Sequence, residues 1–297
     1  MIEGQEGVSW EHWLALADAC ERHGLEGLFR SDHYLTIGGP PQLGSLDAWT
    51  TLAGLAVRTS RIRLGTLVSP ATFRHPSVLA KSAVTVDHIS GGRVELGIGA
   101  GWYEAEHRAY GFPFPDRSTR LEVFAEQLEI VRRQWTEERV DFAGRHYALV
   151  DCPAEPKPVQ RPHPPLIVGG AGKRGTVEPA VRFADEYNTT FVGAEECRAR
   201  RHALDEACER AGREPTSLRF SLMTQCVVGT DQAEVSRRLE RVGGRQEGAI
   251  VGTVDEVTEQ LRALEAAGVE RVMLQHLAHE DVEMVVLIGE ELVPAVA

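Results

Sequence analysis

Residues 73–102 have the sequence FRHPSVLAKSAVTVDHISGGRVELGIGAGW. Pro76 predicts the first turn of a helix that runs to about Ile89, because proline is favoured at the first helical position. A short apolar run at Val94–Ile98 follows after a turn, and such a run is typical of a strand that is buried on both faces. A helix followed directly by a buried strand is the repeating unit of an α/β protein.

The same alternation extends to both sides of this stretch. It begins with a helix at Trp10, ends with a helix near Leu292, and shows no change of composition that would indicate a linker. The regular repeat favours an α/β fold of the (β/α)8 TIM-barrel type over a doubly wound open sheet. We therefore predict a single domain, residues 1–297, whose clear strands lie at Gly27–Ser31, Ile62–Val68, Val94–Ile98, Leu166–Gly169, Tyr187–Val192, Phe220–Val228 and Val269–Gln275.

Two parts of the sequence depart from the regular repeat. Residues 141–165 carry six prolines, which predicts turns and an edge hairpin, and we interpret them as a Pro-rich insertion after strand 4. The first strand is the other departure, because only Met1–Gln5 is available for it before the first helix. We expect this strand to be short or truncated, with the full strand beginning upstream.

The composition argues against several classes of protein. Lys and Arg number 32 and Asp and Glu number 44, so the net charge of −12 repels phosphate backbones and we expect no nucleic-acid partner. No apolar run is long enough to span a membrane, and the start does not resemble a leader, so we expect no membrane partner and a cytoplasmic location. The five cysteines form no C-x-x-C pair and no metal-binding histidine motif occurs, so we expect no metal site.

Polar residues follow the first of the clear strands, at the end where a barrel of this type places its active site. Asp32 and His33 leave that strand together, and a carboxylate beside an imidazole suggests binding or proton transfer. The alternative interpretation is that Asp32 caps a turn and His33 lies on the surface. The next strand ends at Gly65–Pro70, whose spacing alone indicates an ordinary strand end.

Two further strand ends are rich in glycine. Gly97, Gly99 and Gly101 precede Trp102, and glycines at alternate positions let the backbone approach a flat or bulky group. Residues 169–175 join a strand to a helix, where free amides, Lys173 and Arg174 favour phosphate binding, with a plain helix-entry turn as the alternative. Neither segment matches a dinucleotide fingerprint or a P-loop.

These strand ends together resemble the luciferase-like monooxygenase superfamily, especially its coenzyme F420-dependent oxidoreductases. The longest similar segment is residues 73–102, which matches in unbroken register. The resemblance extends over most of the chain through Ser31-Asp32-His33, Leu64-Gly65-Thr66, Gly169-Gly170-Ala171-Gly172 and Val251-Gly252-Thr253.

The resemblance implies a deazaflavin site at the strand ends, with His33 and Asp32 as the catalytic residues. Asp32 would hydrogen-bond the polar edge of the ring, and His33 would orient the substrate or handle its proton. Leu67-Val68 would form a bulge, commonly with a cis peptide bond in this family, that presses on the back of the ring. The implied cofactor-binding residues are Asp32, Thr66, Leu67, Val68, Gly99, Gly101, Gly169, Gly170, Ala171 and Gly172, of which Gly170, Ala171 and Gly172 would hold the phosphate.

Trp102 and Ile37 stand where the sugar-phosphate dehydrogenase branch has a catalytic glutamate and a tryptophan. This difference argues against a sugar phosphate and assigns both residues to the pocket of a bulkier, more apolar substrate.

The resemblance implies an F420-dependent oxidoreductase that transfers a hydride between the deazaflavin C5 and a small organic substrate. An FMN-dependent luciferase-like monooxygenase, served by a reductase partner, is the first alternative, and a non-catalytic flavin-binding barrel is the second. The resemblance also implies a homodimer formed through helices near the start of the chain.

Overall fold

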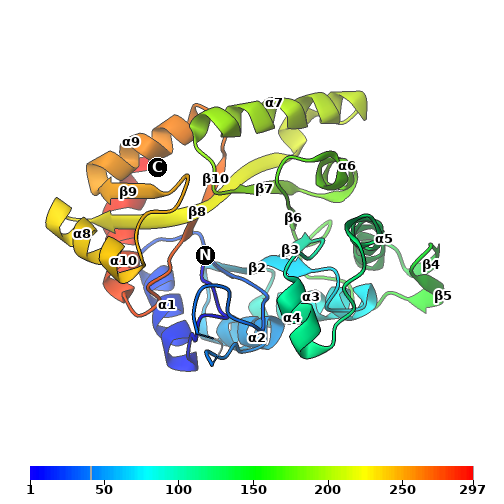
Figure 1. Ribbon diagram of the computed structural model, residues 1–297. Helices are drawn as coiled ribbons and strands as arrows, with labels where there is room; N and C mark the ends of the chain where they lie inside the picture. Colours follow the sequence, from blue (N-terminus) through cyan, green and yellow to red (C-terminus); the bar gives the residue numbers. More distant parts are fainter. Residues whose placement is uncertain (41, 297) are drawn as a thin grey trace.

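The computed structural model describes residues 1–40 and 42–296, and its centre is one sheet of eight parallel strands (Figure 1). Seven of the strands are hydrogen-bonded in the order β1-β2-β3-β6-β7-β8-β10, and β9 pairs with β8. The α/β, (β/α)8 prediction is therefore confirmed. The strands are β1 (Gly27–Arg30), β2 (Arg63–Pro70), β3 (Val94–Gly99), β6 (Leu166–Gly169), β7 (Glu186–Thr190), β8 (Arg219–Gly229), β9 (Ile250–Thr253) and β10 (Arg271–Gln275).

Helices connect the strands and surround the sheet (Figure 1). Side chains fix where several of them begin: Ser9, Asp47 and Asp116 each accept a hydrogen bond from a backbone N–H of the first turn. The helices are α1 (Trp10–Arg22), α2 (Ala48–Arg58), α3 (Pro76–Ser90), α4 (Glu104–Tyr110), α5 (Arg117–Thr136), α6 (Arg174–Phe183), α7 (Ala194–Arg210), α8 (Gln232–Arg241), α9 (Val254–Glu265), α10 (Val282–Leu287) and α11 (Val293–Val296), with a 3-10 turn at Pro215–Ser217 and a π-helical turn at Ile288–Leu292.

The Pro-rich insertion contains the expected hairpin. Its two antiparallel strands are β4 (Arg139–Ala143) and β5 (Ala148–Pro153), so the hairpin begins two residues before the predicted boundary at residue 141. The chain then returns along α3, where the buried carboxylate of Asp87 accepts hydrogen bonds from the amides of Val159 and Gln160.

Strand β9 was not among the predicted strands. Strand β8 is long enough to pair with β10 through Ser221–Gln225 and with β9 through Cys226–Gly229. The sequence signal of β9 is weak because the strand is short and Thr253 already caps α9, in a capping box with Glu256.

The predicted first strand is a stump. Ile2 forms an isolated parallel bridge to Arg30, and the amino group of Met1 donates to the carbonyl of Leu274 over 2.9 Å. These two residues link the edge strands β1 and β10 near their carboxyl ends. Elsewhere along these two strands, among the described residues, no strand pairing joins them.

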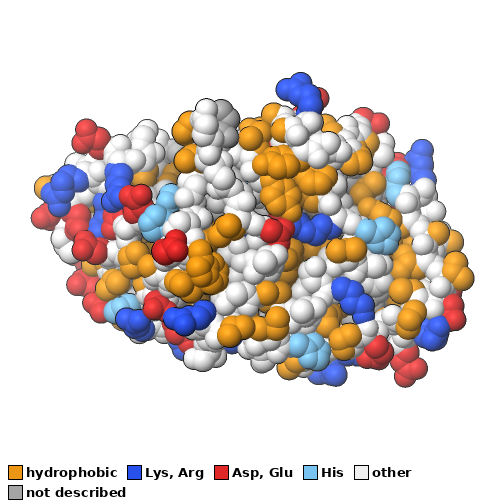
Figure 2. All heavy atoms as spheres, turned by 90° about the horizontal axis from the view of Figure 1, so that it is seen from below, with side chains coloured by type: hydrophobic (Ala, Val, Ile, Leu, Met, Phe, Trp, Pro, Cys, Tyr) orange, Lys and Arg blue, Asp and Glu red, His pale blue; other side chains and the backbone are white. Residues whose placement is uncertain are grey.

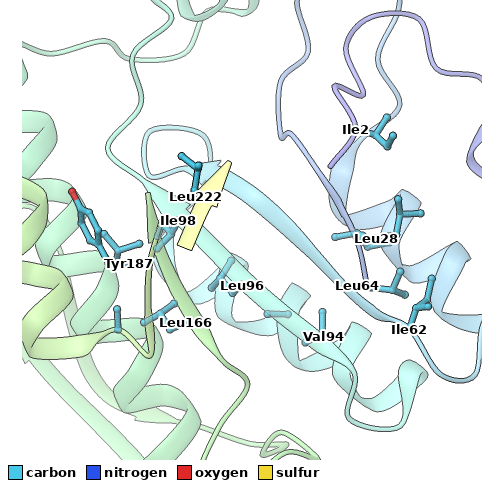
Figure 3. Close-up of a cluster of buried hydrophobic side chains, with 14 of the residues drawn as sticks. Ile2, Leu28, Ile62, Leu64, Val94, Leu96, Ile98, Leu166, Tyr187 and Leu222 are labelled. Carbon is cyan, nitrogen blue, oxygen red and sulfur yellow. The ribbon is translucent and has the colours of Figure 1, made fainter. Parts of the chain in front are cut away.

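The core has two parts. One lies between the sheet and the helices, and Figure 3 shows Leu28, Leu64, Leu96 and Leu166 in it. The other lies inside the barrel and consists of Phe29, Leu67, Ile167, Met223 and Met273.

Ion pairs fill the amino-terminal end of the barrel. The guanidinium of Arg271 lies 2.7 Å from the carboxylate of Glu95 and 3.1 Å from that of Glu186, and all three residues are buried. These ion pairs therefore lie at the end of the barrel opposite to Asp32 and His33.

The surface shown in Figure 2 carries charged side chains toward its two ends and separate groups of hydrophobic ones between them. Among the described residues, no helix is both long and apolar enough to cross a membrane.

Candidate active site

The candidate site lies where β1, β2 and β3 end. Strand β1 stops at Arg30, so Asp32 and His33 follow directly in the loop that leaves the barrel. Asp32 is buried, and the side chain of His33 keeps 11% of its surface exposed. The structure therefore brings the two predicted catalytic residues to one place but gives them different partners.

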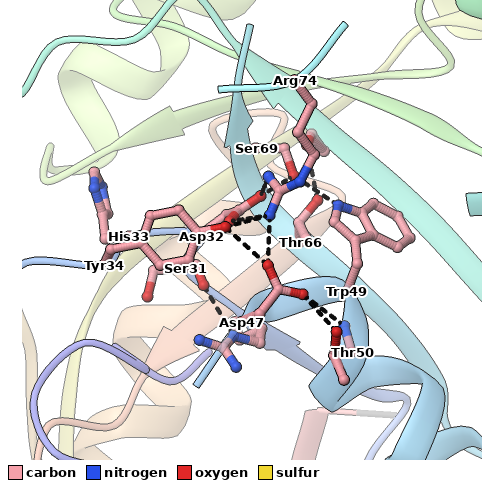
Figure 4. A network of polar contacts seen from close by, with 12 residues as sticks. Ser31, Asp32, His33, Tyr34, Asp47, Trp49, Thr50, Thr66, Ser69 and Arg74 are labelled. Carbon is pink, nitrogen blue, oxygen red and sulfur yellow. Dashed lines mark hydrogen bonds and ion pairs between the residues drawn. The ribbon is translucent and has the colours of Figure 1, made fainter. Parts of the chain in front are cut away.

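Asp32 pairs with Arg74 (Figure 4). One carboxylate oxygen accepts from Nη1 of Arg74 over 2.5 Å and from Oγ of Ser69 over 2.6 Å, while the other accepts from Nη2 of Arg74 over 3.2 Å. Arg74 also reaches Asp47 at 2.9 Å and the hydroxyl of Tyr34 at 3.0 Å. Asp32 thus has an internal partner on each oxygen, and its contact with a cofactor ring stays a prediction.

Burial and neighbouring charges shift the pKa values of Arg74 and Asp47 in opposite directions. Burial alone would lower the pKa of Arg74, but the neighbouring carboxylates of Asp32 and Asp47 outweigh it and raise that pKa. Burial would raise the pKa of Asp47, but hydrogen bonds from Thr50 and Tyr34 and the charge of Arg74 lower it to about 2. Arg74 and Asp47 are therefore both charged at neutral pH, and Arg74 lies between the carboxylates of Asp32 and Asp47.

His33 pairs with Glu106, a fully buried residue of α4. Nδ1 of His33 donates to the carboxylate over 2.8 Å, and the amides of Tyr34 and Leu35 donate to the other oxygen of the same group. Burial would lower the pKa of His33, but the hydrogen bond and charge of Glu106 raise it. Because Nδ1 is engaged, Nε2 is the ring nitrogen that can face a ligand.

The bulge predicted at Leu67-Val68 is present. The peptide bond between these residues is cis, and the register of β2 against β3 shifts between Thr66 and Ser69. The contact of this bulge with a cofactor ring stays a prediction. Thr66 is buried, and its hydroxyl donates to the carbonyl of Gly97 over 2.8 Å, so it serves the strand pairing.

The glycines at the ends of β3 and β6 make room for Val68. A Cβ atom on Gly99 would lie 2.7 Å from a methyl group of Val68, and one on Gly169 would lie 3.0 Å from its other methyl group. Gly101 has a φ of +79°, and a Cβ there would meet Oγ1 of Thr72 at 2.7 Å. These glycines therefore shape the bulge and the turn, and their cofactor contacts remain predictions.

The turn predicted to hold phosphate already uses two of its amides. The N–H of Gly170 donates to the carbonyl of Asn188 over 2.9 Å, and the N–H of Gly172 donates to the hydroxyl of Tyr187 over 2.8 Å. Phosphate binding by Gly170, Ala171 and Gly172 thus stays a prediction, and it would require at least these two bonds to be shared or exchanged.

Trp102 lies next to His33, whereas Ile37 lies farther along the loop between β1 and α2 that also carries His33. The ring centroids of Trp102 and His33 are 5.9 Å apart with the rings nearly perpendicular, and 61% of Trp102 is exposed. Ile37 is also exposed, and its amide donates to Glu6 over 2.8 Å. The structure thus supports an apolar surface beside His33 through Trp102.

Sequence reasoning missed Arg74 and Glu106. Arg74 lies inside the quoted segment 73–102, and Glu106 follows Trp102 by four residues, but nothing local indicates that they contact Asp32 and His33. In the described residues, no group of three histidine, cysteine or acidic side chains could hold a metal ion.

The family model described as "Luciferase-like monooxygenase" matches residues 2–247. The chain belongs to this family. An uncharacterized protein of Mycobacterium tuberculosis is 41% identical over 146 residues, which cover 49% of this chain and 50% of that protein. An F420-dependent glucose-6-phosphate dehydrogenase of Intrasporangium calvum is 37% identical over 168 residues, 52% of this chain and 49% of the relative. The chain thus spans about half the length of these curated relatives.

The similar proteins include enzymes named for either cofactor. An FMNH2-dependent dimethylsulfone monooxygenase of Pseudomonas putida is 27% identical over 66% of this chain and 53% of its own length. The solved structure of an F420-dependent secondary alcohol dehydrogenase superposes with a TM-score of 0.85 at 19% identity, covering 100% of this chain and 98% of that one. A monooxygenase of Streptomyces bottropensis has a TM-score of 0.81 at 26% identity, covering 100% and 99%. The relatives and structural neighbours named here are dehydrogenases and monooxygenases.

Proposed function

We propose that this enzyme is an F420-dependent oxidoreductase that transfers a hydride between the deazaflavin C5 and a small apolar organic substrate. The observation that carries the proposal is the Glu106–His33 pair beside the exposed Trp102. It combines an oriented proton donor with an aromatic surface at the open end of the barrel. Relatives named as F420-dependent support the choice of cofactor.

The strand ends offer a surface that suits a planar ring. Val68 and Phe191 are partly buried and pack on the apolar cluster inside the barrel, so they cover its carboxyl end with hydrocarbon. Polar groups of His33, Asp32 and Arg74 lie at the ends of the neighbouring strands. A ring with apolar faces and a polar edge fits this combination. When bound, the deazaflavin supplies the hydride chemistry, and the protein supplies orientation and proton transfer.

His33 is the residue that would handle the proton. A ketone that accepts a hydride at its carbon also needs a proton on its oxygen, and oxidation of an alcohol releases that proton. The raised pKa of His33 keeps more of its imidazole protonated near neutral pH, which suits donation to a ketone oxygen. Trp102 would hold the apolar part of the substrate next to this group.

An FMN-dependent monooxygenase is the second candidate. It is favoured by the dimethylsulfone monooxygenase among the relatives and by the similarity to the S. bottropensis enzyme over the whole chain. This function would require a reductase partner to deliver reduced flavin.

The test of the proposed function compares His33→Ala with His202→Ala, which removes an exposed histidine on α7. We expect His33→Ala to bind F420 normally and to lose about 100-fold or more in the rate of F420 turnover with ketones or alcohols. His202→Ala should retain both binding and rate. Equal turnover by the two variants would contradict the role of His33.

We also propose that the enzyme forms a homodimer through helices near the start of the chain, and light scattering on the purified protein would test this. The proposed location is the cytoplasm, which agrees with five cysteines that are all free.

A further inference from the structure

The turn after β3 holds Trp102 in a fixed position at the open end of the barrel. The carbonyl of Gly101, the residue before it, accepts a hydrogen bond from Nε of Arg120 over 3.1 Å. The hydroxyl of Tyr103, the residue after it, donates to the carbonyl of Thr36 over 3.0 Å. Hydrogen bonds on both sides of Trp102 therefore fix the backbone that carries its indole.

A buried imidazole fixes the same turn from a third direction. His107 of α4 is buried and uses both of its ring nitrogens. Nδ1 lies 2.7 Å from the carbonyl oxygen of Tyr103, and because a carbonyl can only accept, Nδ1 carries a proton. Nε2 lies 2.6 Å from the hydroxyl of Thr72 in the loop after β2. His107 thus joins the turn that carries Trp102 to the neighbouring loop.

The indole of Trp102 is exposed although its backbone is fixed. Its ring stacks on that of Tyr103, with centroids 5.2 Å apart and 26° between the planes, and yet 61% of the residue is exposed. An aromatic ring that is fixed in place and open on one face is a preformed surface for a ligand, because little conformational freedom is lost on binding.

His33 lies beside the stacked pair and leaves the outer face of Trp102, the face turned away from Tyr103, uncovered. The ring centroid of His33 is 5.9 Å from that of Trp102 and 6.2 Å from that of Tyr103. An imidazole over the outer face would be much farther from Tyr103 than from Trp102. The two nearly equal distances therefore place His33 at the side of the pair, next to the open face.

We propose that the enzyme acts on carbonyl compounds that carry an aromatic ring, and that this ring stacks on the outer face of Trp102. The proposal rests on the proposed function, which supplies reduced F420 as the hydride donor. Stacked aromatic rings have centroids about 4.5–7 Å apart. A carbonyl group attached to such a ring can then reach His33, whose imidazole is 5.9 Å from the indole.

The aromatic class is favoured over an aliphatic one because of the kind of contact that Trp102 offers. A saturated ring gains only from the apolar area that it covers. An aromatic ring covers a similar area and also gains from the offset stack, so it binds more tightly at the same size. The fixed and open indole is thus a surface that distinguishes the two classes.

The reduction of such a carbonyl balances with the groups of this site. The carbonyl carbon forms a C–H bond with the hydride and its electron pair, and the π bond of the carbonyl opens onto oxygen. That oxygen takes the proton from Nε2 of the His33 imidazolium, and the product is an alcohol. The cofactor is oxidised, and the proton that it releases to solvent balances the one that His33 takes back.

The test compares acetophenone with cyclohexyl methyl ketone, which has the same number of carbon atoms and a saturated ring. Calorimetric titration of the full chain, with oxidised F420 and without it, measures the Kd of each ketone in the absence of turnover. Steady-state kinetics with reduced F420 then give kcat/KM. We expect acetophenone to be preferred about fivefold in both measurements.

Two substitutions of Trp102 separate stacking from apolar contact. Trp102→Leu keeps an apolar side chain and removes the aromatic face, so the Kd and kcat/KM for acetophenone should each worsen about fivefold. The values for cyclohexyl methyl ketone should change less than about twofold. Trp102→Phe is the matched control and should retain the preference. Both variants should melt within about 2 °C of the parent protein, because the side chain is exposed.

The outcomes separate this proposal from the proposed function. Equal Kd values for the two ketones in the parent protein, or equal losses for both in Trp102→Leu, would overturn the aromatic substrate class, and turnover of both ketones would then still support hydride transfer. A preference for acetophenone that depends on Trp102, without turnover of either ketone, would support the stacking surface and contradict the proposed function.

Discussion

Nδ1 of His33 lies 2.8 Å from the carboxylate of Glu106, which α4 carries into the interior of the protein. The same carboxylate also accepts the amides of Tyr34 and Leu35, so the loop after β1 is fixed around it. Glu106 thus positions His33 and stabilises its imidazolium, while Nε2 remains for the ligand.

Glu106→Gln should shift the pH dependence of turnover. The amide oxygen can still accept hydrogen bonds, but the charge that raises the pKa of His33 is lost, so that pKa should fall. We expect the rate of ketone reduction above neutral pH to fall about tenfold and the optimum to move toward acid. NMR titration of His33 and a pH profile of kcat/KM would measure this.

The control for this change is Glu122→Gln, which alters a partly exposed pair with His146 away from the candidate site. A pH profile that moves equally in both variants, or in neither, would contradict the positioning role of Glu106. The Glu106–His33 pair should also make the stability of the protein depend on pH. Because the pKa of His33 is raised in the folded protein, His33 adds stability at pH values below its unfolded pKa. This contribution is lost as the pH rises through the folded pKa.

Arg74→Met should destabilise the protein strongly. It leaves the buried carboxylate of Asp32 without its counter-charge, and removing one partner of a buried pair costs about 3–5 kcal/mol. Arg174→Met, at an exposed pair on α6, should change the free energy of unfolding by about 1 kcal/mol or less. Denaturant melts would compare them. The double variant Arg74→Met/Asp32→Asn should recover part of the loss, and no recovery would argue against an unpaired charge as the cause.

Gly99→Ala should disturb the bulge, since the added methyl group would lie 2.7 Å from Val68. We expect a stability loss of about 1–3 kcal/mol and weaker cofactor binding. Adding Val68→Ala should restore stability by removing the clash. If Gly99→Ala melts and binds like the parent protein, Gly99 is not needed to make room for Val68.

Ionisation of Asp47 should make the stability of the folded protein decrease at acid pH. Its pKa of about 2 lies below the ordinary value of about 3.9, so its contribution is present above the unfolded pKa and is lost as the pH falls toward 2. Asp47→Asn should therefore be less stable than the parent at pH 7, with a smaller difference at pH 3. Denaturant melts at the two pH values would test this, and a constant difference would show that ionisation of Asp47 contributes nothing.

The barrel could be predicted from the sequence because buried strands and amphipathic helices alternate, and their hydrophobic residues recur with different periods. The end of each strand then indicates where residues of the candidate site lie. Asp32, His33 and the bulge at Leu67-Val68 could be located in this way. The partners could not, because Arg74 is 42 residues from Asp32 and Glu106 is 73 residues from His33. Only the pairing of the neighbouring strands β1, β2 and β3 brings these residues together.

Glycines at strand ends have two structural explanations that the sequence does not separate. Gly99 and Gly169 match a pattern associated with cofactor approach, yet their nearest neighbour is Val68 of the same barrel. Spacing cannot distinguish a glycine that admits a ligand from one that admits a side chain.

A pair of fluorescence titrations of the purified protein, one with F420 and one with FMN, would show which cofactor it binds. We predict saturable quenching of F420 at micromolar concentrations or below and at least about tenfold weaker binding of FMN, a difference of about 1.4 kcal/mol. Tighter binding of FMN than of F420 would contradict the proposed hydride transfer through the deazaflavin and would indicate the monooxygenase function instead.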